Sequence, residues 1–402
     1  MLTQRQLFLK HLAQTSPSPL LLEIERAEGL FLYDRQGKAY MDLIAGIGVS
    51  SLGHRHPRVI AAIREQLDCY LHTMVYGEYV LSPQVKLAQK LCEQLPESLN
   101  SVYLVNSGTE ATEGAMKLAK RYTGRAEMIA CKNAYHGSTQ GAASLMWPTD
   151  FTQAYHPLLP GIKHIDFNCE KCLEKISTHT AAVIIEPIQA ESGVNKPSSD
   201  YLRKLRARCT EVGALLVFDE IQTGFGRTGS LFAFEQYDVV PDVLLLAKGM
   251  GGGMPIGAFV ASQNLMEHFT HHPVLGHITT FGGHPLSSAA ALATLETLLE
   301  GDWIQQVKEK EAWFLHLLQH PSIVAIRSAG LWLALELESF DRVLQVVQTC
   351  IQKGVITDWF LFNNRSLRIA PPLIIEKEQI EWACSVILES LEGGGVSSFL
   401  PG

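Results

Sequence analysis

Long apolar runs, internal repeats and low-complexity tracts are missing from this chain of 402 residues. No apolar stretch approaches the length that crosses a bilayer, and residues 1–11 lack the apolar core of a signal peptide. The formal net charge of -8 argues against nucleic acid or an anionic membrane as a partner. We therefore expect a cytoplasmic protein that binds neither nucleic acid nor membrane.

Cysteine is sparse and irregularly spaced, with eight residues in the chain. This usage fits a reducing compartment rather than a disulfide framework. The Cys-x-x-Cys motif formed by Cys169 and Cys172 lacks the second ligand pair of a zinc site, so we interpret it as two free thiols near a helix start. His268, His271 and His272 lack carboxylate or cysteine partners and are interpreted as a solvated helix end. We expect no metal site.

Lys248 stands where an apolar run, residues 243–247, gives way to a glycine-rich turn. Such a run predicts a strand that is buried on both faces. An amine in apolar surroundings loses the solvation of its charged form, so its pKa falls and the neutral amine can form a Schiff base. The alternative is a lysine at a strand end that reaches out to water.

Asp219 ends a second apolar run, residues 214–218, and a loop containing three glycines follows it. Ligands of open α/β sheets bind at the carboxyl ends of the strands, so Asp219 and Lys248 could approach one bound molecule. A buried aspartate needs a cationic partner. A protonated pyridine nitrogen is such a partner, and its pairing with a Schiff-base lysine is the signature of pyridoxal phosphate sites.

With these residues, the chain resembles the class III, or ω-amino-acid, aminotransferases, which are pyridoxal phosphate enzymes of fold type I. The resemblance covers residues 29–373, and in length and motifs it is closest to the acetylornithine and ornithine aminotransferases. It implies an α/β fold with a mostly parallel sheet flanked by helices. Alternating strand and helix patterns predict such a large domain over residues 55–295. Residues 1–54 and 296–402 would form a smaller α+β domain from both chain ends.

Shorter patterns predict individual elements. Residues 28–44 are typical of a hairpin with its turn at Gln36-Gly37. Residues 58–66 and 84–95 have the apolar spacing of helices. The glycine-rich tail, residues 393–398, is expected to fray.

Ser107, Gly108 and Thr109 follow a predicted strand, residues 101–105, and open a predicted helix. N–H groups at a helix N-terminus and small hydroxyl residues suit a phosphate, although an ordinary N-cap explains the same residues. The resemblance assigns the cofactor phosphate to these three residues.

The resemblance also assigns the rest of the cofactor site. In the family, the aromatic residue at the position of Tyr135 stacks on the pyridine ring, which its π face suits. Without the resemblance, this residue is equally a core ring at a strand end. The resemblance further implies that Ile221 packs on the opposite ring face, that Gln222 contacts the 3-oxygen, and that His136 and Glu186 belong to the site.

Ser138 departs from the family pattern. Ornithine, acetylornithine and 4-aminobutyrate aminotransferases typically have an arginine here, which holds the distal carboxylate of the amino donor. A serine cannot provide a charged, two-point clamp. Donors without that carboxylate, such as amines and diamines, therefore remain an alternative.

Glu191 and Arg368 are the expected carboxylate switch. Arg368 lies between apolar residues and a Pro-Pro turn, where carboxylate recognition is the usual use of an arginine. The resemblance assigns the substrate α-carboxylate to Arg368 and makes Glu191 a glutamate that pairs with it and releases it. A loop carboxylate that faces water is the alternative for Glu191. Both residues together favour 2-oxoglutarate or glutamate as one substrate.

Thr280 precedes Phe281-Gly282-Gly283-His284, with histidine where the family commonly has asparagine. The resemblance implies that Thr280 reaches the phosphate bound by the other subunit, which requires at least a homodimer with shared active sites. A plain loop is the alternative.

The expected function is a ping-pong aminotransferase that moves an amino group from an acetylornithine- or ornithine-like donor to 2-oxoglutarate. Lys248 would hold the cofactor and transfer protons, while Asp219 keeps the pyridine nitrogen protonated. An amine or diamine transaminase is the first alternative. A protein that binds pyridoxal phosphate without turnover is the second, and related isomerases and decarboxylases share the same cofactor site.

Overall fold

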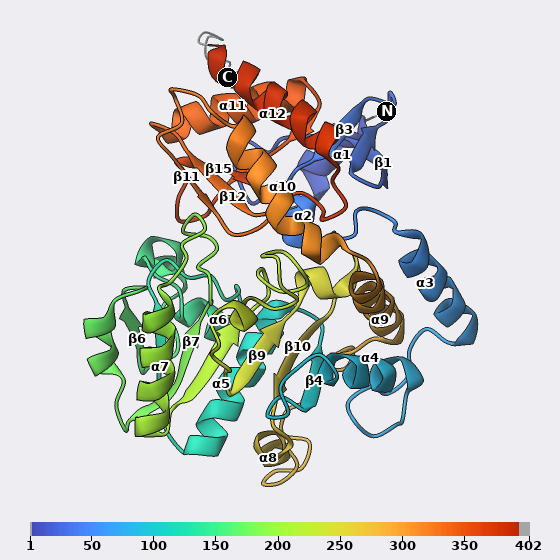
Figure 1. Cartoon of the computed structure of the whole chain (residues 1–402). Coiled ribbons are helices and arrows are strands. Elements are labelled where there is room, and N and C mark those ends of the chain that lie inside the picture. Colours follow the sequence, from blue (N-terminus) through green and yellow to red (C-terminus); the bar gives the residue numbers. More distant parts are fainter. Residues whose placement is uncertain (1, 394–402) are drawn as a thin grey trace.

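The structure is a computed structural model, and it describes residues 2–393. A seven-stranded sheet, in the order β4-β10-β9-β8-β7-β5-β6, forms the centre of the lower body in Figure 1. Only β10 runs antiparallel to its neighbours within this sheet, so the expectation of a mostly parallel sheet is confirmed. Its strands are β4 (Ser101–Val105), β5 (Glu127–Cys131), β6 (Ile162–Ile165), β7 (Thr180–Ile185), β8 (Leu215–Asp219), β9 (Val243–Leu246) and β10 (Gly257–Ala261).

The central strands are apolar and every residue of β7, β8 and β9 is buried, as expected of a sheet covered on both faces. Helix α5 begins directly after β4 and contacts β10 and β9. Ser107 is the N-cap of α5 and Gly124, in the left-handed conformation, is its C-cap. The principal helices of this part are α3 (Pro57–Cys69), α4 (Ser82–Cys92), α5 (Gly108–Thr123), α7 (Ser199–Val212) and α9 (Pro285–Glu300).

Two smaller four-stranded sheets lie above the large one in Figure 1, where N-terminal strands (blue) sit beside C-terminal elements (orange and red). In the first, β13 pairs in parallel with β3, so distant parts of the chain share one sheet. Its strands are β1 (Ile24–Glu28), β2 (Phe31–Asp34), β3 (Ala39–Asp42) and β13 (Val355–Ile356). The second contains β11 (Ala325–Ser328), β12 (Leu333–Glu336), β15 (Ser366–Ile369) and β14 (Asp358–Trp359).

The local sequence predictions hold. The hairpin is formed by β2 and β3, and the N–H of Gly37 donates to the carbonyl of Asp34 across the turn. The helices expected at 58–66 and 84–95 are α3 and α4. The predicted fraying of the tail concerns residues 394–398, which lie outside the described part of the chain. The remaining helices are α1 (Gln4–His11), α2 (Ala45–Gly48), α6 (Gln140–Ser144), α8 (Gln263–Met266), α10 (Trp303–Leu317), α11 (Phe340–Gln352) and α12 (Lys377–Glu392).

The Pro-Pro turn after β15 is held by two buried cations from different parts of the chain. Arg227, in the loop after β8, donates to the carbonyl of Pro371, and Lys310 on α10 donates to the carbonyl of Leu373 at 2.7 Å. Two further N–H groups of the turn donate to carbonyls in the segment 43–51. The backbone that follows Arg368 is therefore fixed to both the loop after β8 and the N-terminal segment.

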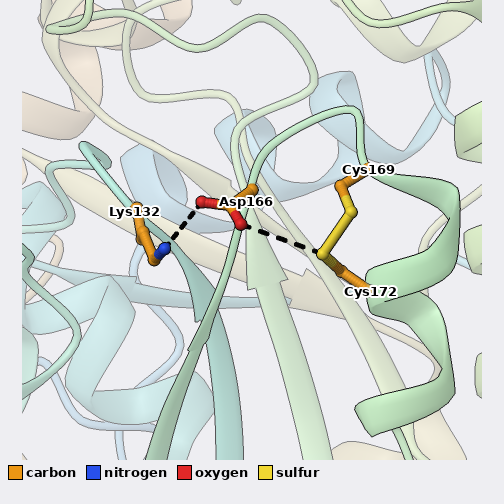
Figure 2. The surroundings of a disulfide bond; sticks show 4 residues. All are labelled: Lys132, Asp166, Cys169 and Cys172. Carbon is orange, nitrogen blue, oxygen red and sulfur yellow. Dashed lines mark hydrogen bonds and ion pairs between the residues drawn. A yellow bond between two sulfur atoms is a disulfide. The ribbon is translucent and has the colours of Figure 1, made fainter.

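The cysteine motif differs from our interpretation. Cys169 and Cys172 form a disulfide bond with a Cα–Cα distance of 5.3 Å, so the expectation of two free thiols is wrong (Figure 2). The sequence separation of three allows the bond because the chain turns into a 3-10 helix at Glu170. Asp166, in the same loop region, forms an ion pair of 2.8 Å with Lys132.

The three histidines near residue 270 are exposed, and they lie within or just after the short helical segment Glu267–Phe269, which follows α8, so they form a solvated helix end as expected. Within residues 2–393, no group of histidine, cysteine or acidic side chains could hold a metal ion. No helix in the described part of the chain is long and apolar enough to cross a membrane.

Candidate active site

A cavity of about 510 Å³ opens where β4, β5, β7, β8 and β9 end. This is the edge at which open α/β sheets bind ligands. Most of the predicted site residues line it, although they come from five separate segments of the chain. These are Ser107, Gly108, Thr109, Tyr135, His136, Ser138, Glu186, Asp219, Ile221, Gln222 and Lys248.

Lys248 begins the turn after β9 and lines the cavity. Its pKa is lowered from 10.5 to about 8, chiefly by burial; Arg368 adds to the lowering, whereas Glu191, Asp219 and Glu186 oppose it. The backbone of Lys248 has a φ of 46°, a conformation that L-residues rarely adopt and that is often found at functional sites. The fold thus directs a weakly basic amine into the cavity, as the sequence predicted.

Asp219 is 4% exposed and both of its oxygens have partners. Oδ2 lies 2.7 Å from Nδ1 of His136, and Oδ1 accepts the N–H of Ile221 at 3.0 Å. These bonds fix the carboxylate at the end of β8, within the wall of the cavity. The sequence predicted a cationic partner for Asp219 but did not identify His136 as its neighbour.

The N-terminus of α5 forms a tight cradle. The hydroxyl of Ser107 accepts the N–H of Glu110, as an N-cap does, and the hydroxyls of Thr109 and Thr139 lie 2.8 Å apart. A Cβ on Gly108 would lie 2.7 Å from the side chain of Ile221. A larger residue at this position would force the side chain of Ile221 to shift, and the N–H of Gly108 belongs to the first turn of a helix, where anions bind.

Glu191 and Arg368 form a buried two-point ion pair: Nη1–Oε1 and Nη2–Oε2 are both 3.1 Å. Gln222 donates to Glu191 Oε1 at 3.1 Å, and the N–H of Leu361 donates to Oε2 at 2.9 Å. Burial raises the pKa of Glu191, but Arg368 and then Lys248 outweigh it, so the net pKa is lowered. The alternative of a water-facing loop carboxylate is therefore wrong.

Asp358 is a further acid beside Arg368 that sequence reasoning missed. Its Oδ1 lies 3.0 Å from Nε of Arg368, because these residues face each other across β14 and β15. Arg368 also donates to the carbonyl of Trp359 at 2.7 Å and lies 4.7 Å over the ring of Phe360. Nothing in the sequence marked Asp358, since a two-residue strand is too short to be predicted.

Ser138 lies at the cavity wall, with its hydroxyl 2.9 Å from the hydroxyl of Tyr135. The titratable side chains that line the cavity are Tyr135, His136, Glu186, Asp219 and Lys248. Among the described residues, no arginine lines this cavity.

Thr280 is exposed and does not line the cavity of its own chain. Its neighbour Thr279 instead accepts N–H groups from Gly282, at 2.7 Å, and from the side chain of Asn106, at 3.2 Å. Asn106 lines the cavity and was also missed from the sequence. The only signal for it was its place directly before Ser107.

The cavity fits pyridoxal phosphate group by group. It presents helix N–H groups and hydroxyls for a phosphate, a fixed carboxylate for a pyridine nitrogen, and an amine for the carbonyl carbon. Glu186 Oε2 and His136 Nε2 are buried here without a hydrogen-bond partner among the described residues. Unpaired buried polar atoms of this kind indicate a site that a polar ligand completes.

Comparison with known proteins agrees with this geometry. The chain is 38% identical over 373 residues to an acetylornithine aminotransferase of Methanopyrus kandleri, covering 92% of this chain and 94% of that one. It is 41% identical over 367 residues to a putrescine aminotransferase of Pectobacterium atrosepticum, covering 87% and 77%. The ornithine aminotransferase of Toxoplasma gondii has a similar structure, with a TM-score of 0.88, 32% identity and coverage of 96% and 93%.

The sequence model of the family described as aminotransferase class-III matches residues 12–391, which is nearly the whole chain. The resemblance inferred from Lys248 and Asp219 is thereby confirmed, as is the fold. Together with the relatives above, this match shows that the chain belongs to the class III aminotransferases, enzymes whose cofactor is pyridoxal phosphate.

Proposed function

We propose that this aminotransferase takes an amino group from an ornithine- or acetylornithine-like donor and passes it to 2-oxoglutarate. The acetylornithine aminotransferase of Methanopyrus kandleri supports the donor class, because the two chains match over nearly their whole lengths. The buried pair of Glu191 and Arg368 supports a dicarboxylate acceptor. This ion pair is the single observation that carries the proposal. Arg368 provides one carboxylate-binding position, and Glu191 fills it until a substrate carboxylate takes its place.

In this proposal Lys248 holds the cofactor and moves a proton at the substrate carbon. Its pKa of about 8 leaves part of the amine neutral near neutral pH, so that the amine can both bond and accept a proton. Asp219, fixed by His136, provides the negative charge that keeps the pyridine nitrogen protonated. When bound, pyridoxal phosphate supplies the electron sink for the reacting carbon.

The remaining cavity residues position the cofactor. Ser107, Gly108 and Thr109 bind the phosphate at the N-terminus of α5. Tyr135 and Ile221 would hold the two faces of its ring, and Gln222 would contact the ring's 3-oxygen. Gln222 also donates to Glu191, so it links the ring site to the carboxylate switch.

Arg368 binds the α-carboxylate of glutamate or 2-oxoglutarate after Glu191 has left its guanidinium. The two-point geometry of the pair supports this role, because an incoming carboxylate can replace both contacts. With a donor that has no carboxylate at this position, Glu191 stays on Arg368 and neutralises it.

A homodimer with shared active sites is part of the proposal. Thr280 is exposed, as a residue that serves a second subunit must be, and large apolar side chains in its own segment, residues 274–281, are exposed as well. Such clusters are typical of protein interfaces. These exposed side chains are Val274, Leu275, Ile278 and Phe281.

A half-reaction measured by cofactor absorbance tests the donor. Purified holoenzyme is mixed with N-acetylornithine, ornithine or putrescine, without an acceptor, and 2-oxoglutarate is added afterwards. We expect N-acetylornithine or ornithine to bleach the resting band and 2-oxoglutarate to restore it. Bleaching by putrescine alone would replace this function with that of a diamine transaminase, which Ser138 and the Pectobacterium relative favour.

The Lys248→Ala variant tests the central assignment. We expect product formation to fall by about a thousandfold or more and the lysine-dependent absorbance band to vanish. Lys171→Ala, at an exposed lysine, is the matched control and should behave as the wild type. Wild-type turnover by Lys248→Ala would overturn the assignment.

We also propose that residues 55–295 form the large domain and that the two flanking parts of the chain form the small one. The separate small sheets built from the two ends of the chain support it. The cytoplasmic location stays a prediction.

A further inference from the structure

Glu186 follows β7 and is 4% exposed, with its side chain at the wall of the active-site cavity. One oxygen, Oε1, accepts the N–H of Ala190 at 3.0 Å. The other, Oε2, has no hydrogen-bond partner among the described residues. A buried polar atom without a partner is costly unless a ligand completes it.

The cations of the site are already engaged with other acids. Arg368 is paired with Glu191 and Asp358, and His136 lies against Asp219. An ionised Glu186 would therefore be an additional buried anion without a contacting cation, which the protein interior does not stabilise.

Lys248 does not provide a contacting cation for Glu186. It is not in ion-pair contact with Glu186, and in the proposed function its amine is bonded to the cofactor in the resting enzyme. Burial and then Asp219 hold the pKa of Glu186 well above its ordinary value; Ala190 and Lys248 lower it, and Glu191 raises it. Cys131, which ends β5 and interacts electrostatically with Glu186, is buried, and burial raises the pKa of its thiol to about 12.

We propose that Glu186 stays protonated during the reaction and donates a hydrogen bond from Oε2 to an anionic or carbonyl oxygen of the molecule bound in the cavity. This assignment rests on the proposed function and makes Glu186 a neutral donor rather than a base. The accepting oxygen belongs either to the cofactor ring or to the substrate, and the experiment separates these two sources.

Glu186→Ala and Glu186→Gln are compared in the holoenzyme. The alanine removes the donor, whereas the glutamine keeps a neutral side chain with an N–H in place of the O–H. We expect Glu186→Ala to lower kcat/KM about tenfold or more, as the loss of one hydrogen bond predicts, and Glu186→Gln to recover most of that loss. At alkaline pH the wild type should lose activity as Glu186 ionises, and Glu186→Gln should lack that decline.

The resting absorbance spectrum identifies the accepting oxygen. A shift of the cofactor band in Glu186→Ala without substrate assigns the oxygen to the cofactor. An unchanged band with a raised KM for 2-oxoglutarate assigns it to the substrate. Infrared difference spectra between the wild type and Glu186→Gln should show the carbonyl stretch of a protonated carboxylic acid, and Glu338→Gln, at an exposed acid, should leave that signal in place.

Two results would overturn the proposal. Glutamine as damaging as alanine, with no carboxylic-acid signal, would mean that Glu186 acts as an ionised group. Wild-type kinetics in Glu186→Ala would mean that it donates to nothing. Failure of the proposed function is a separate result, since the infrared signal and the resting spectrum do not depend on which donor reacts.

Discussion

Oδ1 of Asp358 lies 3.0 Å from Nε of Arg368, whereas Glu191 contacts the two Nη atoms of the same guanidinium. Strand pairing fixes the position of Asp358, because it faces Arg368 directly in the register of β14 and β15. Two acids therefore share one arginine. In the proposed function, the Nη edge exchanges Glu191 for a substrate carboxylate, while Asp358 stays beside Nε.

This arrangement makes stability depend on pH. Burial raises the pKa of Asp358 from 3.8 to about 7; Arg368 opposes the rise and Glu191 adds to it. The folded state then binds more protons than the unfolded state between these values, so stability falls as the pH rises from 3.8 to about 7. Asp358→Asn should lose fewer degrees of Tm than the wild type over this range, with about 1 °C for each kcal/mol in a chain of this length. Thermal unfolding at several pH values measures this.

Asp341→Asn, at an exposed aspartate on α11, is the control for that series. Its unfolding curves should follow those of the wild type at each pH. If the curves of Asp358→Asn also ran parallel to the wild type, Asp358 would be ionised across the range and the argument from burial would fail.

Ser138→Arg restores the residue that the family typically has. The new guanidinium would stand at the cavity wall, where it can pair with a distal carboxylate, although the hydroxyl contact between Ser138 and Tyr135 is lost. We expect the KM of N-acetylornithine to fall about tenfold, as a charged hydrogen bond of about 1.5–3 kcal/mol allows. Steady-state kinetics measures it, and the KM of putrescine should not fall. An equal fall for both donors would contradict the clamp.

Gly257→Ala should weaken the phosphate cradle. A Cβ at this position would lie 2.4 Å from the carbonyl oxygen of Ser107, which is backbone and cannot simply swing aside. We expect a loss of about 1–3 kcal/mol of stability and faster release of the cofactor on dilution. Gly393→Ala, whose new Cβ would meet only ordinary contact distances, is the control. Wild-type cofactor retention in Gly257→Ala would contradict the prediction.

Alkylation tests the disulfide. Without a reductant, Cys169 and Cys172 should resist a thiol reagent, and both should react after treatment with dithiothreitol. Peptide mass spectrometry identifies the labelled residues. Cys69 is exposed and free, so it should react under both conditions and serves as the internal control. Labelling of Cys172 before reduction would support the original interpretation as free thiols.

The central sheet could be predicted from the sequence because its strands are continuous apolar runs that end in chemically distinctive residues. Lys248 and Asp219 mark the ends of β9 and β8, and the ligand edge of the sheet follows from the rule for strand ends. The N-terminus of α5 was equally clear, since Ser107 is both an N-cap and a cavity residue.

The missed contacts depend on tertiary structure instead. The neighbours of Arg368 belong to a strand of two residues, whose register no local pattern specifies. The pairing of His136 with Asp219 joins residues 83 positions apart, and the disulfide requires a turn that its spacing only permits. Side chains that meet across such distances are chosen by packing, not by periodicity.

Arg227 and Lys310 donate to the backbone of the Pro-Pro turn, and these bonds restrict the movement of the strand that carries Arg368. The strand that carries Arg368 cannot slide or tilt without breaking bonds to the loop after β8 and to α10, both of which are packed in the core. Arg368 is therefore the stationary partner. In the proposed carboxylate switch, Glu191 is then the side chain that moves, and the exchange between donor and acceptor requires only its rotation away from Arg368.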